Sequence, residues 1–293
     1  MKTEISAYAK INLFLDVVGI REDGYHDVEN VMQSISLFDT VEVELLDDER
    51  IIIECDKEGV PLGDKNIAHK AARLFFDRAN IKKGARIKIK KNIPMAAGLA
   101  GGSADGAAVL VGLNELCNNT FSKEELCKMG AILGADVPFC IVCGSMYSDG
   151  RGDNLREFPS ISENTCFVIA CGGEGVSTPW AYGMLDKDYN NFIGYEKKGT
   201  QLLYKAIVAG DDAFCDELFN LFEATVSRER PVVSEIKEIM ETHGAKRAMM
   251  SGSGPSVFGV FKDAQSAETA SKKILEKGYF SCVAYPIFER KQV

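Results

Sequence analysis

The feature that most limits how this chain can fold is a glycine-rich segment, PMAAGLAGGSAD, at residues 94–105. Before it, at residues 85–91, Ile87 and Ile89 alternate with basic residues, a pattern that is typical of a strand. After it, small and apolar residues at 103–117 predict a helix. Glycines let backbone N–H groups approach a ligand closely, and the start of a helix favours negative charge. The segment therefore predicts an anion site between a strand and a helix.

Two familiar nucleotide-binding motifs are excluded by the same segment. No Gly-Lys-Ser or Gly-Lys-Thr follows the glycines, and no GxGxxG is present. A simple glycine-rich turn stays an alternative. One of the basic residues just upstream could reach a phosphate, while most of them fit a solvated strand face. These residues are Lys82, Lys83, Arg86, Lys88, Lys90 and Lys91.

The remaining pattern indicates an α+β chain. Strands are expected in residues 1–56, where Lys10–Val18 and Val41–Leu46 alternate. A capping box, Ser122 with Glu125, opens one helix, and Gly134 closes it. The predicted helices are 66–79, 103–117 and 123–133, then segments near 178–185, 200–209, 211–226, 231–243 and 263–277. The later predicted strands are 166–171, 246–250, 256–261 and 279–288.

Length and composition fit two globular domains. The chain has 293 residues, 46% of them hydrophobic and 26% charged, which excludes a disordered chain. A chain of this length buries enough surface to need no disulfide or metal staple. The order of elements is neither strictly βαβ nor all-β, so we predict α+β domains at 1–158 and 159–293.

Charge and cysteine usage narrow the class of partner. A net charge of −9 argues against nucleic acid or an anionic membrane surface as a general partner. No run approaches the ~20 apolar residues that cross a bilayer, and the first residues do not resemble a signal peptide. The nine cysteines lack framework spacing, and no second pair or His joins Cys140 and Cys143 in a zinc pattern. We expect reduced thiols, a cytoplasmic location and a small-molecule partner.

Several isolated polar residues are candidates for a site. Lys10 and Asn12 share one face of a strand, and a Lys on a buried face needs a charged partner or a ligand. Tyr25 and His26 place an aromatic ring and an imidazole in a loop. Asp136 is expected at the end of a helix and before an apolar strand. A carboxylate at that end opposes the helix dipole, which argues for another partner.

Taken in order, five segments resemble the signatures of the GHMP small-molecule kinases between residues 6 and about 262. They are AKINLFL, GYH, PMAAGLAGGSADGAA, LGADVPF and MSGSGPSVF. REDGYHDVENVMQSISLFDTVEVE is similar to the branch of this family that phosphorylates the 2-hydroxyl of a cytidine diphosphate derivative of methylerythritol, in the non-mevalonate route to isoprenoids. The resemblance implies an N-terminal domain like the second domain of ribosomal protein S5 and a ferredoxin-like C-terminal domain.

The resemblance also implies a site. Lys10 and Asp136 match the family's catalytic pair, with ATP and Mg²⁺ as cofactors and the Mg²⁺ ligands left open. Tyr25 and Tyr182 are expected to enclose the cytosine while His26 bonds to its edge. The implied substrate-side positions are Asn12, Tyr25, His26, Thr178 and Tyr182. The implied nucleotide-side positions are Asn66, Lys91, Pro94, Met95, Ala96, Ala97, Gly98, Leu99, Ala100, Gly101, Gly102, Ser103, Ala104 and Asp105.

The chain departs from the family pattern in places. Ser103 is followed by Ala104 where many relatives have a second serine, and Gly106 lies in the first helical turn. No Lys-Pro precedes the GVST-like segment at 175–178. Two alternatives follow: another kinase of the family, acting on homoserine, mevalonate or a sugar, or a nucleotide-binding homologue without catalysis. The sequence leaves open whether the chain is a monomer or a homodimer.

Overall fold

The structure is a computed structural model that describes residues 1–210 and 212–290. Its strands are β1 Lys2–Ile20, β2 His26–Leu46, β3 Ile51–Cys55, β4 Gly84–Lys90, β5 Ser145–Gly150, β6 Asn154–Glu157, β7 Cys166–Cys171, β8 Phe219–Asn220, β9 Arg247–Met250, β10 Val257–Phe261, β11 Phe280–Ala284 and β12 Pro286–Ile287. Its α-helices are α1 Ile67–Ala79, α2 Gly101–Leu116, α3 Lys123–Leu133, α4 Val137–Val142, α5 Thr178–Asp188, α6 Gln201–Ala209, α7 Phe222–Glu229, α8 Val232–Thr242 and α9 Ala264–Glu276, and two short 3₁₀ helices are η1 Asn190–Phe192 and η2 Asp212–Glu217.

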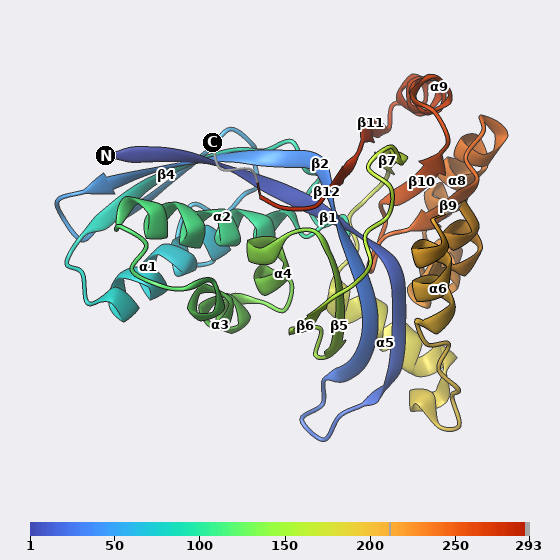
Figure 1. Ribbon diagram of the computed structural model, residues 1–293, viewed down its shortest axis with the longest axis horizontal. Coiled ribbons are helices and arrows are strands. Elements are labelled where there is room, and N and C mark those ends of the chain that lie inside the picture. Colours follow the sequence, from blue (N-terminus) through green and yellow to red (C-terminus); the bar gives the residue numbers. More distant parts are fainter. Residues whose placement is uncertain (211, 291–293) are drawn as a thin grey trace.

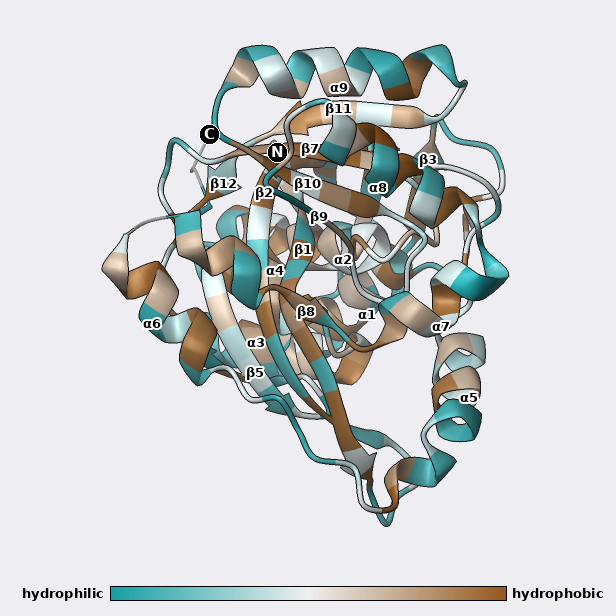
Figure 2. Cartoon of the chain, turned by 90° about the vertical axis from the view of Figure 1, so that its right-hand side faces the viewer, coloured by the Kyte–Doolittle hydropathy of each residue, from teal (hydrophilic) through white to brown (hydrophobic). Residues whose placement is uncertain are grey.

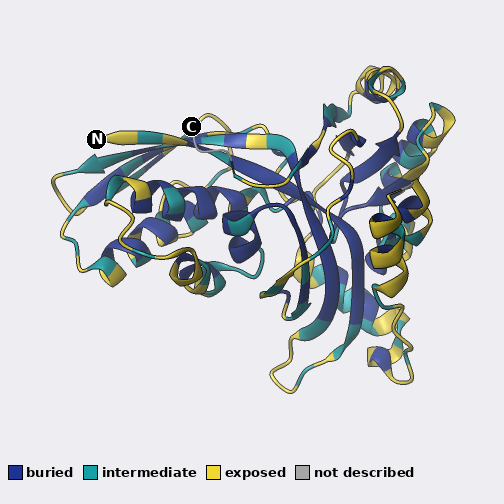
Figure 3. Cartoon of the chain, in the orientation of Figure 1, coloured by how far each residue is buried: buried dark blue, intermediate teal, exposed yellow. Residues whose placement is uncertain are grey.

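A large mixed sheet carries the N-terminal part of the chain. Its path runs β3-β4-β2-β1-β8, and β5, β6 and β12 join it through β2. The long antiparallel pair β1–β2 extends from this sheet to the far hairpin tip at the bottom of Figure 1. Helix α2 packs on β1 and β2, with α1 beside it. Most of the middle of both strands is buried, as Figure 3 shows in dark blue.

The C-terminal part contains a four-stranded antiparallel sheet in the order β11-β7-β10-β9. Taken along the chain, these strands and their helices follow a β-α-β-β-α-β order, which confirms the ferredoxin-like prediction. Strand β7 alternates between two cores: Phe167 and Ile169 face the large sheet, and Val168 and Ala170 face the helices. Figure 2 shows the result, with apolar residues concentrated on β7 and β10 and mixed colours on the outer helices.

Strand β1 contributes residues to three hydrophobic cores: one under α1 and α2, one between the two sheets and one beneath the C-terminal helices. This arrangement positions the site. Its residues Ala9, Ile11 and Leu13 pack into the core between the two sheets. Because successive side chains on a strand point to opposite faces, Lys10 and Asn12 point the other way. Both are buried. The strand thus presents two polar side chains from an apolar framework.

Three predicted elements were wrong in type or extent. The run 137–142 is helix α4 rather than a strand, because Pro138 lies in its first turn, where no N–H is needed. Residues 212–226 do not form one helix, and residue 211 of the predicted helix 211–226 lies outside the described residues. Leu218 belongs to the inter-sheet core and Leu221 to the helix-side core, so the described chain breaks at β8 between them. The predicted strand 279–288 divides, because β11 pairs with β7 and β12 with β2.

The two predicted domains both contribute strands to the large N-terminal sheet. Strand β8 pairs in parallel with β1, and β12 pairs with β2, so segments after residue 158 complete the first sheet. The boundary at 158 and 159 therefore stays a prediction. All nine cysteines are free thiols, as expected. Within the described residues, no helix combines the length and apolar character needed to cross a membrane.

Candidate active site

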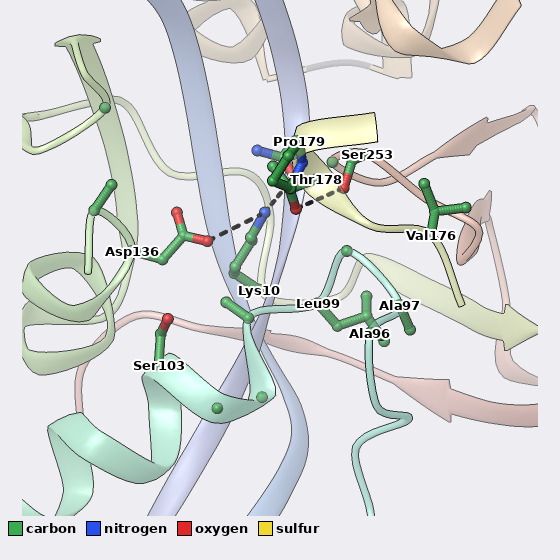
Figure 4. A pocket seen from close by; sticks show the side chains of 18 of the residues that line it. Lys10, Ala96, Ala97, Leu99, Ser103, Asp136, Val176, Thr178, Pro179 and Ser253 are labelled. Atoms are coloured by element: carbon green, nitrogen blue, oxygen red, sulfur yellow. Dashed lines mark hydrogen bonds and ion pairs between the residues drawn. The ribbon is translucent and has the colours of Figure 1, made fainter. Parts of the chain in front are cut away.

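One cavity of about 920 Å³ collects the candidate residues. It is lined by the glycine-rich loop (residues 94–104) and the start of α2, by β1, and by helix α5 of the C-terminal part. Every residue that the resemblance implied lies on its wall except Ala104, which is fully buried behind it. Figure 4 shows Lys10 between Asp136 on one side and the Thr178 segment on the other. The topology therefore brings residues from both ends of the chain to one site.

Four consecutive carbonyl groups hold the glycine-rich loop against the protein. The carbonyl oxygen of Ala96 accepts from Val176 N, and that of Ala97 accepts from Ser256 N. The carbonyl of Gly98 accepts from the Ser251 hydroxyl, and that of Leu99 accepts from Lys10 N. All four donor–acceptor distances are 3.2 Å. The carbonyl oxygens of the loop are thus hydrogen-bonded to residues from distant parts of the chain.

The donors of the same loop stay available. Within the described part of the chain, no amide N–H from residue 95 to residue 103 donates a hydrogen bond. Positive φ angles at Ala96, Gly98 and Ala100 alternate with negative ones, a backbone form that makes a concave anion site. No side chain caps the start of α2. The first N–H groups of a helix, left free in this way, attract a phosphate.

A buried ion cluster joins the two ends of this loop. The Lys91 ammonium contacts the Asp39 carboxylate and lies 2.8 Å from Asp105 Oδ2. The other Asp39 oxygen accepts from the backbone N–H groups of Asn92 and Ile93, at 2.6 and 2.8 Å. Lys91 is therefore a partner of two carboxylates rather than part of a solvated face. The cluster fixes the residues on both sides of the glycine-rich loop.

The contribution of this cluster to the stability of the folded chain depends on pH because of Asp105. Burial, with Asp39 nearby, raises the pKa of Asp105 to about 7 in spite of Lys91, and its Oδ1 has no partner among the described residues. In the unfolded chain the group titrates near pH 4. The folded state thus holds a proton that the unfolded state releases, so this stabilisation is complete below about pH 4 and is lost as the pH rises through about 7.

We expect Asp105→Asn to remove that dependence. The free energy of unfolding of the variant, relative to the unaltered chain, should increase with pH between about 4 and 7, by at most ~1.4 kcal/mol per pH unit. Urea unfolding of both proteins at several pH values measures the difference. A difference that is constant with pH would show that Asp105 is ionised in the folded state across this range.

The two residues of the predicted catalytic pair line the same cavity as the glycine-rich loop. Lys10 Nζ is 3.9 Å from Asp136 Oδ2, and only 6% of the Lys10 side chain is exposed against 35% for Asp136. Asp136 precedes α4, at the favourable end of the helix dipole, which corrects the prediction that it ends a helix before a strand. Its carboxylate caps no backbone N–H. The side chain is therefore free to act on a ligand.

A polar network orients Lys10. Its ammonium donates to Asn12 Oδ1 at 2.6 Å, and Asn12 Nδ2 donates to Asn30 Oδ1 at 2.8 Å. The Ser251 hydroxyl lies 3.2 Å from Asn12 Oδ1 and accepts from Asn12 N at 3.3 Å. Asn30 was missed from the sequence, because it stands in β2 among other polar residues such as Glu29 and Gln33 and no local pattern singles it out. Ser251 lies in the segment MSGSGPSVF, which entered the sequence analysis only through the family resemblance and without a role in the site.

Aromatic and charged groups gather at the other end of the cavity. His26 stacks on Tyr182, with ring centroids 4.4 Å apart, and its Nε2 lies 2.6 Å from Asp186 Oδ1. Tyr25 is 57% exposed and has the Arg151 guanidinium over its ring at 4.5 Å. The expected enclosure by Tyr25 and Tyr182 is not preformed, because His26 covers a face of Tyr182. Asp186 and Arg151 were not predicted as site residues.

Between these two ends, the hydroxyl groups of Thr178 and Ser253 lie 3.2 Å apart. Asn66 caps α1, accepting from Ala68 N at 2.8 Å, and this fixes its place on the nucleotide side of the cavity. No group of three or more metal-binding side chains exists within residues 1–210 and 212–290.

Comparisons with known families agree with this architecture. A model of the GHMP kinases N terminal domain matches residues 66–144, and a model of the GHMP kinases C terminal region matches residues 204–279. The structure of a homoserine kinase from Cytophaga hutchinsonii has a TM-score of 0.76 at 17% identity and covers 99% of this chain and 96% of its own, which supports the fold alone. Fold, loop and cavity thus define a GHMP kinase.

Relatives with higher sequence identity show to which branch of the GHMP kinases the chain belongs. The 4-diphosphocytidyl-2-C-methyl-D-erythritol kinase of Acetivibrio thermocellus is 46% identical over 264 residues, 90% of this chain and 91% of the relative. That of Clostridium perfringens is 41% identical over 283 residues, 96% of each. A crystal structure of 4-(cytidine 5'-diphospho)-2C-methyl-D-erythritol kinase has a TM-score of 0.79 at 28% identity and covers 97% of this chain and 99% of its own. The chain belongs to the 4-diphosphocytidyl-2-C-methyl-D-erythritol kinase family.

Proposed function

We propose that this chain transfers the γ-phosphoryl group of ATP to the 2-hydroxyl of 4-diphosphocytidyl-2-C-methyl-D-erythritol. Two named relatives that are 46% and 41% identical to this chain, over 90% and 96% of its length, support the activity. One observation in the structure carries the chemistry: Lys10 and Asp136 face each other across 3.9 Å beside an uncapped helix start and a loop with free amides. Phosphate binding and proton removal are thus available in one cavity.

The gap between Lys10 and Asp136 fits an acceptor hydroxyl. A hydroxyl oxygen hydrogen-bonded to both groups at ~2.8 Å can bridge two atoms 3.9 Å apart. A tertiary hydroxyl is a weak nucleophile, and the transition state of phosphoryl transfer is loose, so positioning and charge neutralisation dominate. Asp136 takes the hydroxyl proton as the oxygen–phosphorus bond forms and ADP leaves. Lys10 stabilises the negative charge on the acceptor and phosphoryl oxygens.

The residues present are compatible with Mg²⁺ held mainly by ATP. Mg²⁺ usually takes one or two protein ligands and completes its shell with water and substrate phosphates. Ser103 offers a hydroxyl that points from the start of α2 toward Asp136. The Ser103 hydroxyl would be the side chain to hold the ion on the protein side. The ion would neutralise charge on the β- and γ-phosphates.

The far end of the cavity fits the cytidine diphosphate part of the acceptor. Tyr25 supplies an exposed ring surface on which a base can stack, and stacking tolerates any base. The Arg151 guanidinium, which lines the cavity beside Tyr25, is suited to pair with the diphosphate. Hydrogen bonds from groups in the plane of the base must therefore carry the selection for cytosine.

Release of ADP from ATP and Mg²⁺ tests this function. The cytidine substrate, homoserine, mevalonate and galactose should be compared as acceptors at equal concentrations. We expect turnover with the cytidine compound alone. Turnover with another acceptor would retain the kinase chemistry and overturn the substrate. No turnover with any acceptor, despite ATP binding, would show a nucleotide-binding protein without catalysis.

A further inference from the structure

His26 is held by two residues of one helix face. Tyr182 and Asp186 are four residues apart on α5, so they lie on the same side of the helix. Tyr182 stacks on the imidazole, and Asp186 Oδ1 lies 2.6 Å from its Nε2. Phe192 adds an edge contact, with ring centroids 5.9 Å apart. The ring plane and one of its two nitrogens are therefore fixed by the protein.

The contact with Asp186 determines which nitrogen of His26 carries the proton. A carboxylate only accepts hydrogen bonds, so the neutral ring must place its hydrogen on Nε2. The other nitrogen, Nδ1, is then an acceptor. Among the described residues, the His26 ring hydrogen-bonds to Asp186 through Nε2. His26 lines the cavity with only 12% of its side chain exposed.

We propose that Asp186 is a specificity-determining positioning residue, which keeps His26 in the tautomer whose Nδ1 accepts a hydrogen bond from the exocyclic amino group of cytosine. This inference rests on the proposed function, which places a cytidine nucleotide at this end of the cavity. Asp186 acts through His26 and does not itself contact the reacting atoms.

The chemistry of the two pyrimidines explains the selection. Cytosine presents an amino donor where uracil presents a carbonyl acceptor. When Nδ1 of His26 is an acceptor, the amino group of cytosine can donate a hydrogen bond to it. The carbonyl group of uracil cannot, because both atoms are then acceptors and no proton lies between them. Sites that are built to donate to or accept from one group strongly reject an analogue that leaves them unpaired. Without Asp186, the imidazole can move its hydrogen to Nδ1 and accommodate uracil.

The affinities of CDP and UDP test the inference directly. Isothermal titration calorimetry should give both dissociation constants for the unaltered chain, Asp186→Ala and Asp186→Asn. We expect the unaltered chain to prefer CDP and Asp186→Ala to lose about tenfold or more of this preference. Asp186→Asn keeps an acceptor oxygen for Nε2–H, so it should retain most of the preference despite the lost charge.

Asp188→Ala is the matched control. Asp188 lies on the same helix, but it contacts Thr225 and Arg228 and does not contact His26. We expect its CDP to UDP ratio to equal that of the unaltered chain. In a His26→Ala background, Asp186→Ala should change the ratio no further, because the two residues act together.

The outcomes separate this inference from the function on which it rests. Equal weakening of CDP and UDP by Asp186→Ala would reduce Asp186 to a structural role and overturn the proposal. Turnover of the cytidine substrate by a chain with equal affinity for CDP and UDP would also overturn it, while the proposed function would stand. Absence of turnover with every acceptor would instead remove the proposed function, whatever the nucleotide ratio.

Discussion

Asp136→Asn should bind ATP almost as well as the unaltered chain and lose at least ~10²-fold in kcat. The amide has nearly the shape of the carboxylate but cannot accept the proton of the 2-hydroxyl. Lys10 keeps its hydrogen bond to Asn12, so the cation stays in place. Because the Asp136 side chain caps no N–H, the thermal unfolding temperature should not fall. Steady-state kinetics with ATP and with the acceptor varied separately measures the effect.

Asp47→Asn is a suitable control for the loss of one negative charge. Asp47 is fully exposed, lies 3.5 Å from Lys83, and is not part of the cavity wall. We expect unchanged kinetics in this variant. If Asp136→Asn kept more than a tenth of the turnover, the role of Asp136 as general base would be excluded, and Lys10 with the bound phosphates would have to account for the reaction.

The elements that local pattern predicts are those whose partners lie nearby in the chain. The capping box at Ser122 and Glu125 forms as expected, since both partners are within one turn. The alternation along β1 likewise predicted that Lys10 and Asn12 share a buried face. Short apolar runs are ambiguous, because a few apolar residues fit a buried strand or a buried helix equally well. That ambiguity explains the error at 137–142.

The parts of the site that sequence analysis missed depend on contacts between distant residues. Asp186 is 160 residues from His26 along the chain, and no local pattern connects them. Lys91 lies among other basic residues in the sequence, yet the fold surrounds it with Asp39 and Asp105. Such pairs are set by how the elements pack. Local pattern therefore located the glycine-rich loop, while the groups that hold it in shape required the structure.

The shape of that loop can be tested at Gly98, where we expect alanine to lower kcat/KM for ATP by ~100-fold or more. Gly98 has φ of +78°, and a Cβ there would lie 2.2 Å from the carbonyl oxygen of Ser251. The neighbouring atom is backbone, so the two loops must separate. Their separation also breaks the bond from the Ser251 hydroxyl to the Gly98 carbonyl. The free amides then no longer converge on one phosphate position.

Gly278→Ala separates this effect from backbone strain alone. Gly278 has φ of +82° and open space where a Cβ would be placed, and it follows α9 outside the cavity wall. It should therefore lose about 1–2 kcal/mol of stability without a change in kinetics. Denaturant unfolding and ATP-dependent kinetics of both variants give the comparison. If Gly98→Ala matched Gly278→Ala in both measurements, the docking of the glycine-rich loop on the Ser251 segment would not control phosphate binding. A selective loss at Gly98 would show that a contact between residues 153 positions apart shapes the anion site.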